Sequence, residues 1–205
     1  MVNEWFVVRD GLIGAARFPS LARPRHGISA AELLLLLTCG VTSAAAVGFV
    51  KLSLGIPGHS IVLAALPMAL GMSLAPRRFA GSVMSAGALG TAFLLTQSGG
   101  ARFGSGAFAS LLLLGPVMDV ALRSVRSGWR VYAALVLAGV ATNLMALASR
   151  GVPKLLGLDL PGSRPFDSWW LLASVTYTLS GVVAGLLGAF CWFHSNERES
   201  REPGA

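Results

Sequence analysis

The fold is decided by the stretch KLSLGIPGHSIVLAALPMALGMSLAPRR, which runs from Lys51 to Arg78 and joins a Gly/Pro-rich loop to an apolar run closed by two arginines. From Ser60 to Ala75 no residue carries a charge. In hydrocarbon only a helix satisfies all of its backbone groups within one segment, so this run predicts a membrane helix. Paired arginines in a short turn are typical of the cytoplasmic side. His59, at the opposite end, is therefore expected to face outward.

Composition places the rest of the chain in the same setting. Hydrophobic residues make up 54% of the sequence and charged residues only 12%, a balance that would give a soluble protein an aggregating surface. The net charge of +7 comes from arginines that lie between apolar runs, so membrane topology explains it and nucleic-acid binding does not. Cys39 and Cys191 both fall within apolar runs, where cysteine usually acts as a small hydrophobe.

Six apolar runs predict an all-α integral membrane protein with six transmembrane helices. Each run is near the ~20 residues that cross ~30 Å of hydrocarbon. Residues 28–193 would form this domain, and the expected helices are Ile28–Val50, His59–Ala75, Phe79–Thr96, Gly106–Leu122, Val131–Ser149 and Ser168–Phe193. Residues 1–27 are expected to be cytoplasmic, either as an interfacial amphipathic helix or as a disordered tail, and residues 194–205 as a disordered cytoplasmic tail.

The basic residues favour an orientation with both termini inside. Of the 16 Lys and Arg residues, 11 lie in segments that this orientation places inside and 5 in segments that it places outside. An excess of Lys and Arg marks the cytoplasmic side. The outer five are Lys51, Arg102, Arg150, Lys154 and Arg164.

Polar residues at membrane depth are few, and such residues are costly there and often functional. Asn143 lies near the outer end of its helix, as either a ligand contact or an interhelical hydrogen bond. His59 is either a ligand contact, with a metal ion as one option, or a solvated residue at a helix start. Asp119 is expected to pair with an arginine near the inner face, Arg123 or the pair after Ala75, and Glu32 is expected to do the same.

Helices that alternate in direction bring several polar and aromatic residues into the outward half of the bundle. These residues supply an imidazole, two amides, two aromatics and a loop cation, the mixture that small-molecule pockets use. We therefore expect a site for a neutral or anionic ligand formed by His59, Gln97, Arg102, Asn143, Trp170 and Tyr177.

Small residues recur at four-residue spacing on three helices, which lets backbones approach closely in lipid. Gly40, Ala44 and Gly48 form one such ridge, and either internal packing or a docking face for a partner subunit explains it. The other ridges are Ala134, Ala138, Thr142 and Ala146, and Gly181, Gly185 and Ala189.

Catalytic motifs are absent: the sequence contains no HExxH, GxSxG, CxxC or nucleotide-binding glycine loop. Its three histidines are His26, His59 and His194, and the predicted topology places His59 on the opposite side from the others. We therefore expect neither an enzyme nor a cofactor. If a metal ion binds, His59 is its candidate ligand.

Six helices in 205 residues, both ends inside, a Gly/Pro-rich first outer loop and the Gly40-Ala44-Gly48 ridge together resemble the substrate-binding S component of an energy-coupling factor transporter. The similarity covers 28–193 in architecture, and the ridge loosely matches the family's first-helix alanine motif. The resemblance implies capture of a vitamin-like molecule or metal ion outside a bacterial plasma membrane. It also implies a separate transmembrane coupling protein and ATPase subunits as partners, with the first outer loop as a lid.

Two other classes remain open from the sequence. A membrane assembly or scaffold subunit would have no ligand of its own, and a closed, dry outer end would favour it. Another small transporter or channel would more often show an internal repeat with broken helices in both halves, and no convincing repeat is present.

Overall fold

The structure, a computed structural model, describes residues 30–50, 58–75, 77, 79–123, 125, 129–156 and 170–199, with side chains described up to residue 193. Every regular element in these ranges is an α-helix, which confirms the all-helical class. Expectations for segment 1–27, for loop residues 51–57 and 157–169, and for the last residues of the tail lie outside the described ranges. The helices are α2 (Ala30–Phe49), α3 (Ser60–Leu74), α4 (Ala80–Gln97), α5 (Ser105–Arg123), α6 (Trp129–Leu155) and α7 (Trp170–Glu199).

Two helices extend beyond their predicted ends. α6 continues past Ser149 through Pro153 to Leu155, and α7 continues past Phe193 to Glu199. Residues 194–199 are therefore part of α7, in a segment for which the sequence predicted a disordered tail. Hydrophobicity reports where an apolar run ends, whereas α7 extends at little cost through good helix formers such as Glu197 and Arg198. The extension of α6 instead passes Gly151 and Pro153, so helix propensity does not account for it.

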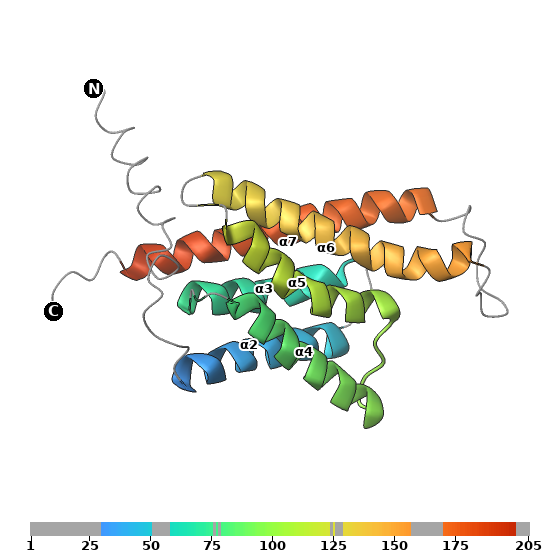
Figure 1. The fold of residues 1–205 in the computed structure, drawn as a ribbon, viewed down its shortest axis with the longest axis horizontal. Helices are drawn as coiled ribbons and strands as arrows, with labels where there is room; N and C mark the ends of the chain where they lie inside the picture. Colours follow the sequence, from blue (N-terminus) through green and yellow to red (C-terminus); the bar gives the residue numbers. More distant parts are fainter. Residues whose placement is uncertain are drawn as a thin grey trace.

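The helices run alternately in opposite directions along the bundle, and the start of α2 and the end of α7 lie at the same end (Figure 1). α3 contacts all five other helices. Its side chains from Ile61 to Met72 include several that are fully buried, among them Ala64 and Met68. The stretch from Lys51 to Arg78 therefore contains the central helix of the bundle.

Four helices are long and apolar enough to cross a membrane: α2, α5, α6 and the Trp170–Phe193 part of α7. α3 has only 15 residues, about 22 Å at ~1.5 Å per residue, which is short of ~30 Å of hydrocarbon. α4 has 18 residues but is not among the four. The structure thus supports a membrane protein, and the expectation of six spanning helices is supported for four.

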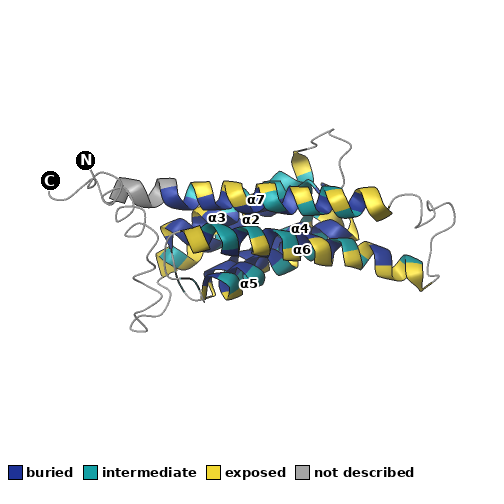
Figure 2. Cartoon of the chain, turned by 90° about the horizontal axis from the view of Figure 1, so that it is seen from above, coloured by how far each residue is buried: buried dark blue, intermediate teal, exposed yellow. Residues whose placement is uncertain are grey.

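Exposed residues lie along the outward faces of the helices (Figure 2), and many of them are large and apolar. Leu34 is 67% exposed, Leu137 67% and Phe190 62%, whereas the buried core consists mainly of alanine, with leucine and methionine next. Such an exposed apolar surface is stable in lipid and would aggregate in water. It supports the assignment of the bundle to a membrane.

Glycines bring two helix pairs into backbone contact. A Cβ atom at Gly115 of α5 would collide with the backbone of Gly81 in α4, and one at Gly139 of α6 would collide with the backbone of Gly181 in α7. Gly185 likewise meets the backbone of Val136, with a Cβ–N distance of 2.7 Å. The ridge of α7 that contains Gly181 and Gly185 therefore packs inside the chain, against the backbone of α6 from Leu135 to Val140.

The ridge on α2 is also covered by the chain itself. A Cβ atom at Gly40 would collide with the Met84 carbonyl of α4, and Ala44 is completely buried. Gly48 lies against Phe103, whose Cζ would be 2.9 Å from an added Cβ atom. This arrangement supports internal packing, rather than a docking face, as the role of Gly40, Ala44 and Gly48. A docking role would require α4 to move away.

Acidic residues fix the turn between α3 and α4 at the end of the bundle where α2 begins. The Nε and Nη2 atoms of Arg77 donate to Glu32 Oε1 at 3.0 and 2.8 Å, which confirms the expected arginine partner for Glu32. Asp119 behaves differently: the N–H groups of Gly81 and Ser82 donate to its two carboxylate oxygens at 2.9 and 2.8 Å. The Ser82 hydroxyl also donates, at 2.7 Å.

The expected ion pair for Asp119 was therefore wrong within the described residues. The carboxylate instead caps the N-terminus of α4 from the neighbouring helix, because Phe79, in the left-handed region at φ 66°, leaves that helix without a side-chain cap of its own. Arg123 lies over the Phe79 ring, with its guanidinium carbon 5.0 Å from the ring centre. Sequence spacing cannot reveal a cap that comes from another helix.

Candidate functional site

Asn143 joins three segments that are far apart in the sequence. Its side chain is completely buried, and its Nδ2 atom donates to the Tyr177 carbonyl of α7 at 2.6 Å and to the Gly58 carbonyl before α3 at 3.3 Å. Of the two roles open for Asn143, the interhelical hydrogen bond is present. The bond to Gly58 also fixes the entrance of the central helix.

Glycine is required at position 58 because of both its conformation and its surroundings. Gly58 has φ 87°, which favours glycine. A Cβ atom there would stand 3.0 Å from Tyr177 Cγ and 3.1 Å from Asn143 Nδ2. The backbone therefore passes close to both side chains, and His59 follows directly as the N-cap residue of α3.

Within the described residues, the other amide atom of Asn143 has no hydrogen-bond partner. Oδ1 is buried and unpaired, as is the hydroxyl oxygen of the neighbouring Thr142. A buried acceptor without a donor costs ~1–3 kcal/mol. The junction of α3, α6 and α7 therefore holds an unused acceptor that a hydroxyl, amine or water molecule would satisfy.

The predicted site residues do not form one site but lie in three separate places. Asn143, Tyr177 and the half-buried His59 lie at one junction. Gln97 is the last residue of α4 and Arg102 lies in the segment after it, and both are exposed. α4 contacts neither α6 nor α7, and its end points away from these helices (Figure 1). Gln97 is therefore apart from the Asn143 junction.

Trp170 belongs to a different feature, a groove of about 230 Å³ between the end of α6 and the start of α7. The residue is 44% exposed. The groove is almost wholly apolar, and its walls are Leu144, Leu147, Ala148, Gly151, Val152, Leu155, Trp170 and Ser174. Its place on the outer surface of the bundle suits an apolar group such as a lipid chain or a ring.

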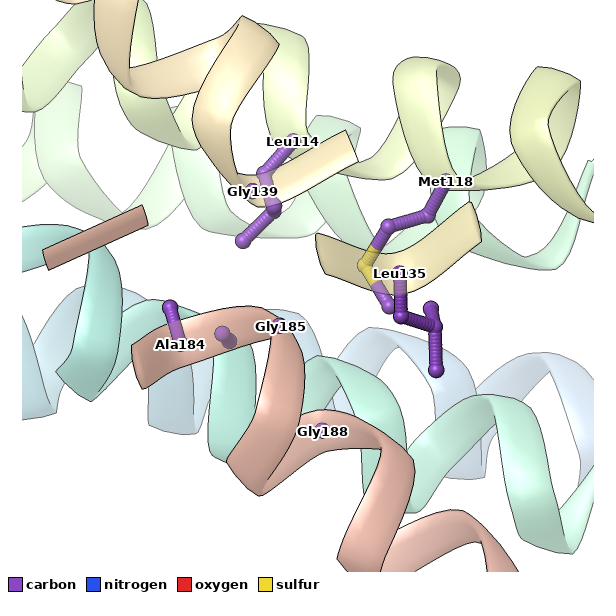
Figure 3. Close-up of a pocket in the computed structure, with 8 residues that line it drawn as sticks. Leu114, Met118, Leu135, Gly139, Ala184, Gly185 and Gly188 are labelled. Atoms are coloured by element: carbon purple, nitrogen blue, oxygen red, sulfur yellow. The ribbon is translucent and has the colours of Figure 1, made fainter. Parts of the chain in front are cut away.

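The interior between α3, α5, α6 and α7 is closed. Figure 3 shows the cavity there, about 10 Å³ in volume and lined by apolar residues such as Leu114, Met118 and Leu135. This is about the space of one water molecule. No substrate-sized chamber is present in this part of the bundle.

Arg150 was not among the predicted site residues, although it is near the same junction. It lies seven positions after Asn143, so the two share one face of α6. Its Nε atom would stand 2.5 Å from a Cβ atom at Gly106 of α5. The seven-residue spacing was visible in the sequence, but the contact with α5 was not.

Among the described residues no group of three or more His, Cys, Asp or Glu side chains could hold a metal ion. His59, the residue predicted as a metal ligand, therefore belongs to no such group among the described residues.

Comparison of the chain with protein-family models, with curated proteins and with solved structures finds no match.

Proposed function

We propose that the chain is the membrane-embedded substrate-binding subunit of a micronutrient uptake transporter, which captures a vitamin-like molecule or metal ion outside and relies on separate coupling and ATPase subunits. The observation that carries the proposal is the convergence of Gly58, Asn143 and Tyr177 from three segments. Among the described residues, the Asn143 acceptor inside this junction has no partner. A purely structural junction would more often satisfy every buried polar atom.

The proposal includes six membrane crossings with both termini inside. α3 and α4 would cross as the shorter helices, with α3 surrounded by the other five and so largely shielded from lipid. Arg77, Arg123 and Arg130 lie at the end where α2 begins, and Arg102, Arg150 and Lys154 at the other. The first end would be cytoplasmic by the excess of arginine in the inner segments.

Cysteine labelling tests this orientation. In a background with Cys39 and Cys191 replaced by alanine, Ser98→Cys should react with an impermeant thiol reagent from outside intact cells. Trp129→Cys, at the opposite end and 74% exposed, should react only after permeabilisation. Labelling of Trp129→Cys in intact cells, or of both positions alike, would contradict the orientation.

Ligand retention tests the function. The protein is purified from its native membrane, denatured, and the released small molecules are identified by mass spectrometry. We expect one metabolite or metal ion in stoichiometric amount from the unmodified chain, much less from Asn143→Leu, and an unchanged amount from Gly90→Ala, whose added Cβ meets nothing within 4 Å. Equal recovery from all three proteins, or recovery of lipid alone, would exclude the proposed site.

A scaffold subunit without a ligand is the second candidate, and the closed interior favours it. The cavity of about 10 Å³ admits no metabolite as it stands. Under this alternative the ligand experiment returns no small molecule from any variant.

A further inference from the structure

The groove between the end of α6 and the start of α7 follows one face of α6. Its walls on this helix recur at spacings of three and four residues, which lie on the same side of a helix: they include Leu144, Leu147, Gly151 and Leu155. Ala148, Gly151 and Ser174 have small side chains or none, so they leave room between the two helices. The space of about 230 Å³ is therefore built by residues of both helices.

The groove opens on a surface of the bundle that suits lipid. α6 and the Trp170–Phe193 part of α7 are two of the four helices that are long and apolar enough to cross a membrane. In and beside the groove, large apolar side chains point outward: Leu155 is 68% exposed, Leu171 64% and Val175 50%. Because such a surface is stable in hydrocarbon and not in water, hydrocarbon is the medium that reaches the groove.

The walls offer almost nothing to a polar ligand. Apart from the Trp170 indole, Ser174 is the only polar side chain among the described walls. Its hydroxyl already donates to the Trp170 carbonyl at 2.8 Å, and no wall residue carries a charge. A polar group that entered would lose its hydrogen bonds to water without gaining others. The occupant is therefore apolar where it contacts the walls.

The length of the groove matches one leaflet of a bilayer. Leu144 and Leu155 are eleven positions apart on α6, about 16 Å at ~1.5 Å per residue, which is about half of ~30 Å of hydrocarbon. One end of the groove lies where α6 ends and α7 begins. Lys154 in the last turn of α6 and Trp170 at the start of α7 are residue types that occupy the membrane–water interface. A phospholipid with its headgroup at that interface has an acyl chain of this reach and direction.

We propose that the groove binds one acyl chain of a membrane phospholipid. The headgroup end of the chain lies between Leu155 and Trp170, and the chain runs along α6 towards Leu144. Such a lipid site is independent of the proposed transport function and of which end of the bundle is outside. It differs from the Asn143 junction in chemistry, because its walls recognise hydrocarbon and not a hydrogen-bonding group.

Quenching of tryptophan fluorescence by a brominated lipid tests the site. The full chain in dodecyl maltoside micelles is titrated with phosphatidylcholine brominated on its acyl chains, and the unbrominated lipid serves as the blank. The Trp170 signal is the difference between the unmodified protein and Trp170→Phe. We expect this signal to fall and to saturate at one lipid per protein, because in micelles only a lipid that the protein retains stays beside Trp170.

Two leucine substitutions on α6 make the readout specific to the groove. Ala148→Leu adds three carbon atoms inside it and should weaken the affinity about ten- to sixtyfold, since each displaced methylene contributes about fourfold. Ala141→Leu is the matched control, because it lies seven positions earlier on the same face of α6 and outside the groove. It should bind as the unmodified protein does. Both alanines are exposed, so neither substitution disturbs the core.

Three results would overturn the lipid site. Equal affinity of Ala148→Leu and Ala141→Leu would show that the groove does not hold the chain. Quenching that rises with lipid and never saturates would show only general contact with micellar lipid. Absence of any quenching of Trp170 would show that the protein itself fills the groove.

Discussion

Replacing Asp119 with alanine should cost more stability than any other change of a charged side chain at the predicted inner end. The carboxylate is 7% exposed and accepts three hydrogen bonds at the start of α4, from two N–H groups and the Ser82 hydroxyl. In Asp119→Ala these donors lose their acceptor inside the bundle, where water does not replace it.

The expected loss follows from the individual contacts. Removal of an N-cap acceptor costs about 1–2 kcal/mol, and loss of the bond from the Ser82 hydroxyl to a charged acceptor adds about 1–2 kcal/mol. Asp119→Ala should therefore lower the free energy of unfolding by about 2–4 kcal/mol. Asp119→Asn should lose most of this, because its NH₂ group faces a donor, and Ser82→Ala should lose about 1 kcal/mol.

Glu32→Gln is the comparison variant at the same end of the bundle. Glu32 and Arg77 are 26% and 28% exposed, and an ion pair so accessible is worth about 0.2–1 kcal/mol. Reversible unfolding in mixed micelles of dodecyl sulfate, followed by circular dichroism, measures all four variants. An equal cost for Asp119→Ala and Glu32→Gln would refute the capping role, as would an unchanged stability in Asp119→Asn.

The remaining predictions concern helix contacts. Gly115→Ala should cost about 3 kcal/mol or more in unfolding free energy, since its Cβ would collide with the backbone of Gly81, whereas Gly90→Ala should be neutral or gain about 0.5–1 kcal/mol. Asn143→Leu should cost about 1–3 kcal/mol because two carbonyls lose a donor; its matched control Thr142→Val removes an unpaired hydroxyl and should not destabilise. Ala44→Leu should lower the unfolding midpoint in detergent by overfilling the α2–α4 contact, and a folded variant of unchanged stability would show that this contact opens.

Much of the architecture followed from the sequence. Apolar runs separated by basic turns predicted helices close to all six observed, because hydrophobicity and helix periodicity are properties of short segments. The same reasoning placed Asn143 and Tyr177 in one half of the bundle from the alternating directions of the helices. It could not show that Asn143 binds the Gly58 carbonyl, since main-chain acceptors carry no sequence signal.

The sequence by itself determined the helical class, the approximate extent of each helix and the end of the bundle at which arginine accumulates. Only the tertiary structure decided which helices are neighbours. It therefore also decided which groups bind Asp119, which helix covers the Gly40 ridge and where Arg150 lies against α5. The physical reason is that a helix's sequence shows which of its faces is small or polar. The identity of the opposing surface depends on how all six helices fill the shared interior.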